Sequence, residues 1–188
     1  GVVFDAELYG SNPHLWRPLP LKDDPSRFDQ YARAARRRGR QWIQAVGRQL
    51  PDATVPSAFL VSFVGKNVDP SDPEVMQLVA RHGYALLPAF TNGMLDGLLP
   101  GMTIVDGNEA AYKYRSAEQF DVSRQLMKER VLPLIAPENR QTYRKQVQAG
   151  QAIYMDIILA GRAPVPVEMK QFEDNVYHAL RTADEYAW

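Results

Sequence analysis

GVVFDAELYG, residues 1–10, is the stretch from which the fold of this chain is best predicted. Val2, Val3 and Phe4 form a continuous run of β-branched and aromatic residues, which is typical of a parallel strand covered on both faces. Asp5 and Glu7 follow directly, two residues apart. Because the ligands of parallel sheets bind beyond the carboxyl ends of the strands, we expect these two carboxylates to lie at a functional site.

The composition is that of one globular α/β domain over residues 1–188. The chain is 45% hydrophobic and 10% aromatic, which suffices for one sizeable core. Its 22 basic and 22 acidic residues cancel, so no net field draws it toward nucleic acid or an anionic membrane. The absence of cysteine excludes disulfides and thiolate metal sites but leaves the compartment open.

The ends of the chain and its hydropathy bear on its location. No apolar run approaches the roughly 18 residues of a membrane helix, and the first residues lack a signal-peptide pattern. We therefore expect a soluble chain with no membrane partner. A secreted or periplasmic location would follow if the full-length chain carries a signal peptide. Gly1 opens inside a strand-like run and Glu185–Trp188 resembles the start of another strand, so we expect a segment of a longer protein.

Helical and strand-like segments alternate along the chain. Apolar periodicity and capping signals, among them a capping box of Ser116 and Gln119, predict helices over 26–49, 72–99 with interruptions, 116–132, 137–150 and 168–183. Strands are expected over 54–63 and 102–105, and 151–160 is either a strand or a continuation of the preceding helix. This alternation requires a parallel sheet with right-handed crossovers, an α/β fold. The chain has neither a GxGxxG motif nor a P-loop, so we expect no nucleotide and assign no cofactor.

A second strand-like run, Met102–Val105, ends in the acids Asp106 and Glu109 and so repeats the opening pattern. Polar and aromatic residues lie near these two acidic strand ends. The candidates for substrate contact are Tyr9, His14, Trp16, Asn67, Asn108, Tyr112 and Tyr114. This mixture suits a carbohydrate, whose ring faces stack on aromatic side chains and whose hydroxyls bond to acids and amides. We expect an oligosaccharide or polysaccharide partner.

Structural roles remain open for several of these candidates. Asp5 and Glu7 are also consistent with binding a neighbouring arginine or capping a loop, and the step from Asp106 to Gly107 is an ordinary turn former. The two tyrosines at 112 and 114 suit core filling as well as sugar stacking.

Two further readings of the charged residues are weaker. The four acids offer oxygen ligands for calcium or magnesium, but the EF-hand pattern is absent and we assign no metal. The arginines of the helix over 26–49 are interpreted as a solvated outer face, since most lie away from its apolar stripe. We therefore expect no nucleic-acid partner.

GVVFDAELYG resembles the strand-end signature of (β/α)8-barrel glycoside hydrolases, and it is similar to the Asp-x-Glu-Tyr end of the chitinase-type motif, in which the glutamate is the proton donor. Gly1 and Val3 stand where that motif has further aspartates, and Leu8 separates Glu7 from the tyrosine. From GVVFDAELYG through IVDGNEAAYKY to ADEYAW, the chain looks like an uncharacterised bacterial family of hydrolase-like barrels. The resemblance implies a parallel (β/α)8 TIM-type barrel, of which this chain is roughly the latter half.

The resemblance also implies a mechanism. Glycosidic cleavage needs one carboxyl as general acid and a second as nucleophile or base. We expect Glu7 to be the acid with Asp5 beside it, because residues two apart on a strand project to the same face and their mutual repulsion raises one pKa. The partner carboxylate is expected to be Asp106 or Glu109. A non-catalytic carbohydrate-binding barrel is the alternative.

Overall fold

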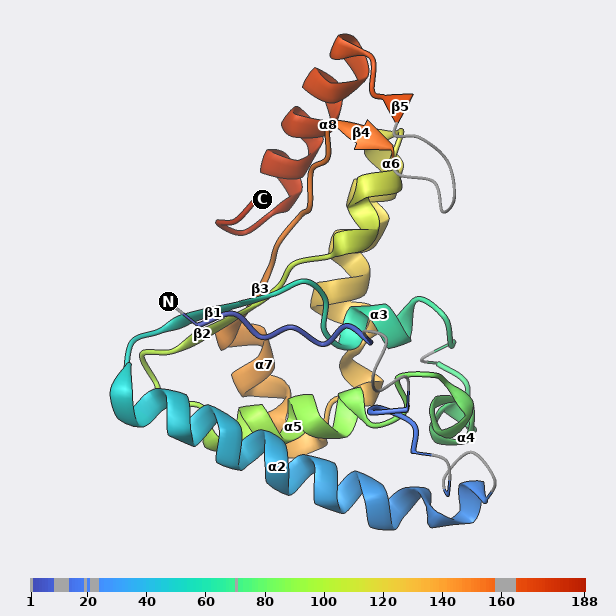
Figure 1. Cartoon of the computed structure of the whole chain (residues 1–188), viewed down its shortest axis with the longest axis vertical. Coiled ribbons are helices and arrows are strands. Elements are labelled where there is room, and N and C mark those ends of the chain that lie inside the picture. Colours follow the sequence, from blue (N-terminus) through green and yellow to red (C-terminus); the bar gives the residue numbers. More distant parts are fainter. Residues whose placement is uncertain (1, 9–13, 19, 21–23, 70, 158–164) are drawn as a thin grey trace.

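The computed structural model describes residues 2–8, 14–18, 20, 24–69, 71–157 and 165–188 (Figure 1). Its α-helices are α2 Phe28–Gln49, α3 Val61–Gly65, α4 Val75–Arg81, α5 Leu87–Gly97, α6 Ala117–Gln125, α7 Arg140–Gln146 and α8 Met169–Thr182. Its strands are β1 Thr54–Ser57, β2 Thr103–Asp106, β3 Val147–Ala149, β4 Asp156–Ile157 and β5 Val165–Pro166. Short 3₁₀ turns at Pro25–Arg27, Glu109–Lys113, Leu132–Leu134 and Pro137–Asn139 and a π turn at Leu126–Arg130 complete the described elements.

The sheet is parallel and its strands lie side by side in chain order, β1-β2-β3. Val55 pairs with Ile104, which pairs in turn with Val147. The N-terminal segment adds a parallel bridge from Phe4 to Ser57, and the Phe4 amide donates to the Pro56 carbonyl oxygen at 2.8 Å. The expected parallel α/β arrangement is therefore confirmed for this part of the chain.

The predicted TIM-type barrel is wrong. In the described residues the parallel sheet has three strands and one added bridge, and β4 and β5 form a separate antiparallel pair. Two expected strands are much shorter than predicted: within 54–63 only β1 Thr54–Ser57 is a strand and α3 begins at Val61, and 151–160 contributes only β4 within its described part. A barrel closes through eight strands, whereas this sheet is short and open.

Helices α2 and α5 run side by side beneath the sheet (Figure 1). Two glycines allow this close approach: a Cβ added to Gly39 would collide with the Phe90 carbonyl oxygen, and one added to Gly93 would collide with the Arg36 carbonyl oxygen. The main apolar cluster lies between these helices and the sheet, and Ile43 of α2 is fully buried in it. This packing fixes the lower face of the sheet.

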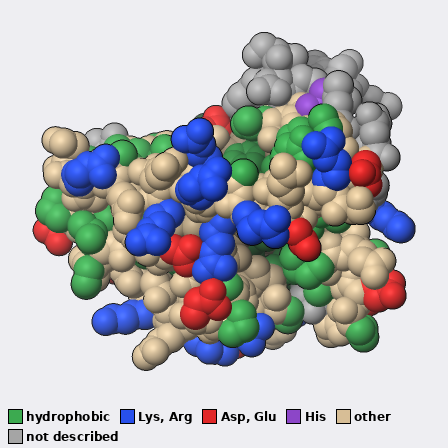
Figure 2. All heavy atoms as spheres, turned by 90° about the horizontal axis from the view of Figure 1, so that it is seen from below, with side chains coloured by type: hydrophobic (Ala, Val, Ile, Leu, Met, Phe, Trp, Pro, Cys, Tyr) green, Lys and Arg blue, Asp and Glu red, His purple; other side chains and the backbone are tan. Residues whose placement is uncertain are grey.

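The basic residues of α2 lie mostly at the surface. Arg33, Arg37, Arg38 and Arg40 are exposed, whereas Arg36 forms ion pairs with Asp96 at 2.6 Å and with Glu138 at 2.8 Å. In the view from below, basic side chains are spread among acidic ones over this face (Figure 2). In the described part of the chain, no helix is both long enough and apolar enough to cross a membrane.

Helices α6 and α8 pack together above the sheet around a second apolar cluster of Phe120 and three alanines (Figure 1). The capping box of Ser116 and Gln119, expected from the sequence, is present at the start of α6. Asp184 follows α8 and accepts hydrogen bonds from Lys128 at 2.9 Å and from the Ala149 amide at 2.9 Å. These contacts hold the C-terminal segment against the end of β3.

Candidate functional site

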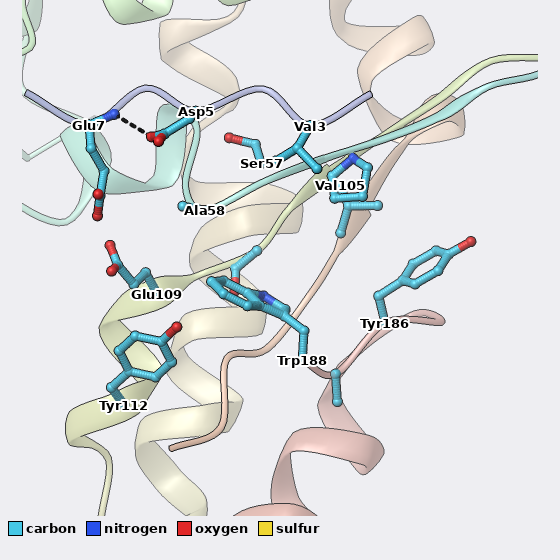
Figure 3. A pocket seen from close by; sticks show the side chains of 13 residues that line it. Val3, Asp5, Glu7, Ser57, Ala58, Val105, Glu109, Tyr112, Tyr186 and Trp188 are labelled. Carbon is cyan, nitrogen blue, oxygen red and sulfur yellow. Dashed lines mark hydrogen bonds between the residues drawn. The ribbon is translucent and has the colours of Figure 1, made fainter. Parts of the chain in front are cut away.

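A cleft of about 490 Å³ lies at the carboxyl ends of the parallel strands (Figure 3). It is lined by Val3, Asp5, Glu7, Pro56, Ser57, Ala58, Val105, Gly107, Glu109, Tyr112, Tyr186, Ala187 and Trp188. Alternation along an extended segment explains part of this set, because residues two apart share a face. Val3, Asp5 and Glu7 therefore belong to the cleft face, whereas Phe4 between them belongs to the core.

The second acidic strand end divides in the same way. Val105, Gly107 and Glu109 line the cleft, whereas Ile104 packs into the main core beneath the sheet. Asp106 is two residues from Ile104 and lies on the same face of the strand. It is fully buried and does not line the cleft. The structure thus brings Asp5, Glu7 and Glu109 together and leaves Asp106 behind them.

Glu7 and Glu109 point toward one another across the cleft (Figure 3). Partial burial, a hydrogen bond between the two carboxyl groups and the negative charges of Glu109 and Asp5 together raise the pKa of Glu7 to about 7. An ordinary glutamate titrates near 4.5, so a pKa of about 7 leaves Glu7 about half protonated at neutral pH. The pair is therefore able to hold one proton between two carboxyl groups.

Asp5 shapes the turn that carries Glu7. Its Oδ1 accepts a hydrogen bond from the Glu7 amide at 2.8 Å (Figure 3), and its side chain also lines the cleft. The amide of Leu8 then donates to the Tyr84 hydroxyl at 3.2 Å. These two contacts hold the backbone on both sides of the Glu7 Cα.

Asp106 has a structural environment. Its Oδ1 accepts hydrogen bonds from the Leu60 amide at 3.1 Å and the Ser62 hydroxyl at 2.8 Å, and its Oδ2 accepts from the Ser62 amide at 3.2 Å. Burial raises the pKa of Asp106, while these hydrogen bonds act to lower it. The carboxylate ties the start of α3 to the end of β2 and so supports the loop that presents Glu109.

Asn108 sets the direction in which Glu109 leaves the strand. It is buried and has φ 45°, in the left-handed region that asparagine tolerates better than most residues. Its side-chain amide donates to Gln151 Oε1 at 2.7 Å and to the Tyr114 hydroxyl at 3.3 Å. Asn108 is thus a support of the cleft wall and does not line the cleft.

The remaining sequence candidates are distributed unevenly. Tyr112 lines the cleft, whereas Tyr114 packs edge-on against Phe120 with ring centroids 5.1 Å apart. Trp16 is buried and donates from Nε1 to the Ala6 carbonyl oxygen at 2.7 Å, so it belongs to the core and not to the rim.

Three candidates lie elsewhere. His14 is half-buried and lies outside the lining of the cleft. Asn67 is exposed just after α3 and donates to the Phe63 carbonyl oxygen at 2.7 Å. Tyr9 lies outside the described residues.

Sequence reasoning missed the aromatic residues that the C-terminal segment brings to the cleft. Ala187 forms a parallel bridge with Gln151, and the Trp188 amide donates to the Gln151 carbonyl oxygen at 3.0 Å. This pairing brings Tyr186, Ala187 and Trp188 to the lining of the cleft. The strand-like pattern of Glu185–Trp188 was visible in the sequence, but its partner 36 residues earlier was not.

A cation, Lys66, lies near the acidic side chains. Lys66 is close enough to interact electrostatically with Glu109 and Asp106, and its ammonium lies 4.1 Å from the centre of the Phe63 ring. Partial desolvation of this ammonium and repulsion from Lys113 lower the pKa of Lys66. In the described part of the chain, no group of three or more acidic, histidine or cysteine side chains is arranged to hold a metal ion.

Neither a family model, nor a curated protein sequence, nor a solved structure matches this chain.

Proposed function

We propose that this chain is a carbohydrate-active enzyme, a glycoside hydrolase that uses Glu7 as the general acid and Glu109 as the partner carboxylate. The observation that carries the proposal is the facing Glu7–Glu109 pair in the cleft, in which Glu7 has a pKa of about 7 (Figure 3). A carboxyl with a pKa near neutral pH, facing a second carboxyl group, is suited to act as the general acid that glycosidic cleavage requires.

The proposed reaction proceeds in two steps. Protonated Glu7 donates its proton to the glycosidic oxygen as the bond from that oxygen to the anomeric carbon breaks, and the Glu109 carboxylate bonds to that carbon. A water molecule then attacks the anomeric carbon, displaces Glu109 and gives its proton to the Glu7 carboxylate. Each carboxyl group ends in the state in which it began.

Of the two glycosidase mechanisms, double displacement has the carboxyl spacing nearer to that of this pair. Retaining enzymes hold their carboxyl groups about 5 to 5.5 Å apart, whereas inverting enzymes need about 6.5 to 9.5 Å to admit a water molecule. Glu7 and Glu109 lie within hydrogen-bonding reach of each other, on the short side of both ranges. We expect the product to retain the configuration of the anomeric carbon, as followed by proton NMR during the first minutes of hydrolysis.

A non-catalytic carbohydrate-binding protein is the second candidate. The contact between Glu7 and Glu109 favours it, because the two carboxyl groups meet where a scissile bond would have to lie. In the enzyme, a bound sugar must separate the pair, and glutamate side chains have the rotatable bonds to allow this. In the binding protein the pair stays closed and the sugar occupies only the rest of the cleft.

Screening the protein against a panel of oligosaccharides and polysaccharides separates the two candidates. We expect the parent protein and a Glu118→Gln control, which alters an exposed carboxylate on α6 outside the cleft, to release reducing ends. Glu7→Gln should release none while remaining folded. Release by Glu7→Gln at the parent rate would refute the proposed acid, and saturable binding without release by the parent would favour the carbohydrate-binding protein.

A further inference from the structure

Trp188 forms one wall of the cleft beside the carboxyl pair. Its side chain lines the cleft, and 48% of the residue's surface is exposed, a large fraction for an indole (Figure 3). An aromatic face left open inside a cleft, next to polar groups, is suited to contact with a ligand. The proposed reaction leaves this indole without a role.

The Trp188 indole is held in one orientation. Its Nε1 donates to the Gly107 carbonyl oxygen at 3.0 Å, and the ring of Tyr112 packs edge-on against it with centroids 5.7 Å apart. The backbone is fixed as well, because the Trp188 carbonyl oxygen accepts from the Ile153 amide at 2.6 Å. An aromatic face that is already ordered loses little conformational entropy when a ligand stacks on it.

Gly107 permits this arrangement. A Cβ at this position would collide with the Ser57 carbonyl oxygen and would lie 2.8 Å from Trp188 Nε1. The absence of a side chain lets the indole reach across the end of β2 toward Glu109. The position of Trp188 relative to the carboxyl pair is therefore built into the sheet end itself.

The charged residues that line the cleft are all acidic. Asp5, Glu7 and Glu109 contribute carboxyl groups, and the lining formed by the described residues contains no lysine, arginine or histidine. Lys66, the nearby cation, lies outside the lining and is exposed. A ligand with its own carboxylate would be repelled by these acids, whereas a neutral or positively charged ligand would not.

We propose that Trp188 is the platform on which a pyranose ring of the glycan stacks, and that the cleft selects neutral and amino sugars over uronic acids. The inference rests on the proposed function, since it names the substrate class of the same cleft. Stacking positions the ring beside Glu7 and Glu109, and the acidic lining discriminates by charge. An amino group on the sugar gains from Asp5 and Glu109, so amino sugars should bind at least as well as neutral ones.

The test measures binding by calorimetry in the Glu7→Gln background, which prevents turnover. The probes are hexamers of glucose, glucosamine and glucuronic acid in both the β-1,4 and the α-1,4 series, so that charge varies within each series while the linkage does not. We expect the glucuronic acid hexamer to bind at least about tenfold more weakly than the glucose hexamer of its series. Asp5→Asn should narrow that difference.

Three variants at Trp188 and elsewhere test the platform. Trp188→Ala should weaken binding of the best hexamer about tenfold or more, and Trp188→Phe, which keeps an aromatic face, should recover most of it. Tyr177→Ala, a control that removes an exposed aromatic ring on α8 outside the cleft, should bind as the background does.

Equal binding of the charged and neutral hexamers, undiminished binding by Trp188→Ala, or no binding by any hexamer would each overturn the inference. Failure of the proposed function has a different signature. The affinity would then depend on the Trp188 side chain and on the charge of the hexamer as expected, but the parent protein would cleave none of the hexamers that it binds.

Discussion

The carboxylates at the strand ends of this protein have similar places in the sequence pattern but two different environments in the structure. Asp106 is fully buried and accepts three hydrogen bonds from Leu60 and Ser62. Glu7 and Glu109 are only partly buried and face each other across an open cleft. The role of an acid at a strand end therefore depends on the face of the sheet on which its side chain lies. On the buried face Asp106 meets hydrogen-bond donors, whereas on the cleft face Glu7 and Glu109 meet each other.

The largest expected effect is on catalysis. Glu7→Gln and Glu109→Gln should each lower kcat by about 10³-fold on the best substrate, the range expected for removing a general acid or its partner. Asp106→Asn keeps a side-chain acceptor and should lower kcat by less than tenfold. Steady-state kinetics on the three variants provides the measurement. A loss of kcat in Asp106→Asn as large as that in Glu7→Gln would show that the two environments do not separate catalytic from structural carboxylates.

The next effect is on stability and should have the opposite distribution. Asp106→Ala leaves the buried amides of Leu60 and Ser62 without their acceptor, so we expect the free energy of unfolding to fall by about 3 kcal/mol. Glu109→Ala removes a side chain from an open cleft and should change it by less than about 1 kcal/mol. Urea denaturation of the two variants provides the measurement, and equal losses would show that the cleft pair is as structural as Asp106.

The smallest effect is the dependence of stability on pH. Between an unfolded pKa near 4.5 and a folded pKa of about 7, the native state holds a proton on Glu7 that the unfolded state has lost. The contribution of Glu7 is therefore most favourable below about pH 4.5 and is lost as the pH rises through about 7. Because the side chain is partly solvated, we expect a loss of order 1 kcal/mol.

Glu7→Gln removes this titration. We measure the free energy of unfolding of both proteins between pH 5 and pH 8. The value for Glu7→Gln minus the value for the parent should therefore increase as the pH rises. Parallel curves for the two proteins would mean that Glu7 titrates at an ordinary pKa and that its pairing with Glu109 does not store a proton.

Prediction from the sequence succeeded where the signal is local. The helix over 26–49 appears as α2 Phe28–Gln49, and the capping box of Ser116 begins α6. It failed at β3 Val147–Ala149, which was read as the end of a helix because three residues are too few for an alternating pattern to be recognised. Pairing with β2 makes that segment a strand, and this pairing is a long-range property.

The candidate site was predicted in part for the same reason. Asp5 and Glu7 share the cleft, as residues two apart on a strand should. The same alternation puts Asp106 and Glu109 on opposite faces. It can be applied only when the register of β2 and the burial of Ile104 are known. Trp16 was a candidate because it follows the first acidic strand end, yet its indole is part of the core.

The sequence by itself determined the α/β alternation, the positions of the longer helices and the placement of acids at the ends of two apolar runs, of which the first forms only the bridge from Phe4 to Ser57 and the second forms β2. Periodicity, capping and strand alternation depend on neighbouring residues alone. The tertiary structure decided that the sheet is short and open, that Glu109 meets Glu7, and that Trp188 lines the cleft from a segment paired with Gln151. These features depend on contacts between segments tens of residues apart, and such contacts are selected by the packing of the whole chain and leave no local pattern in the sequence.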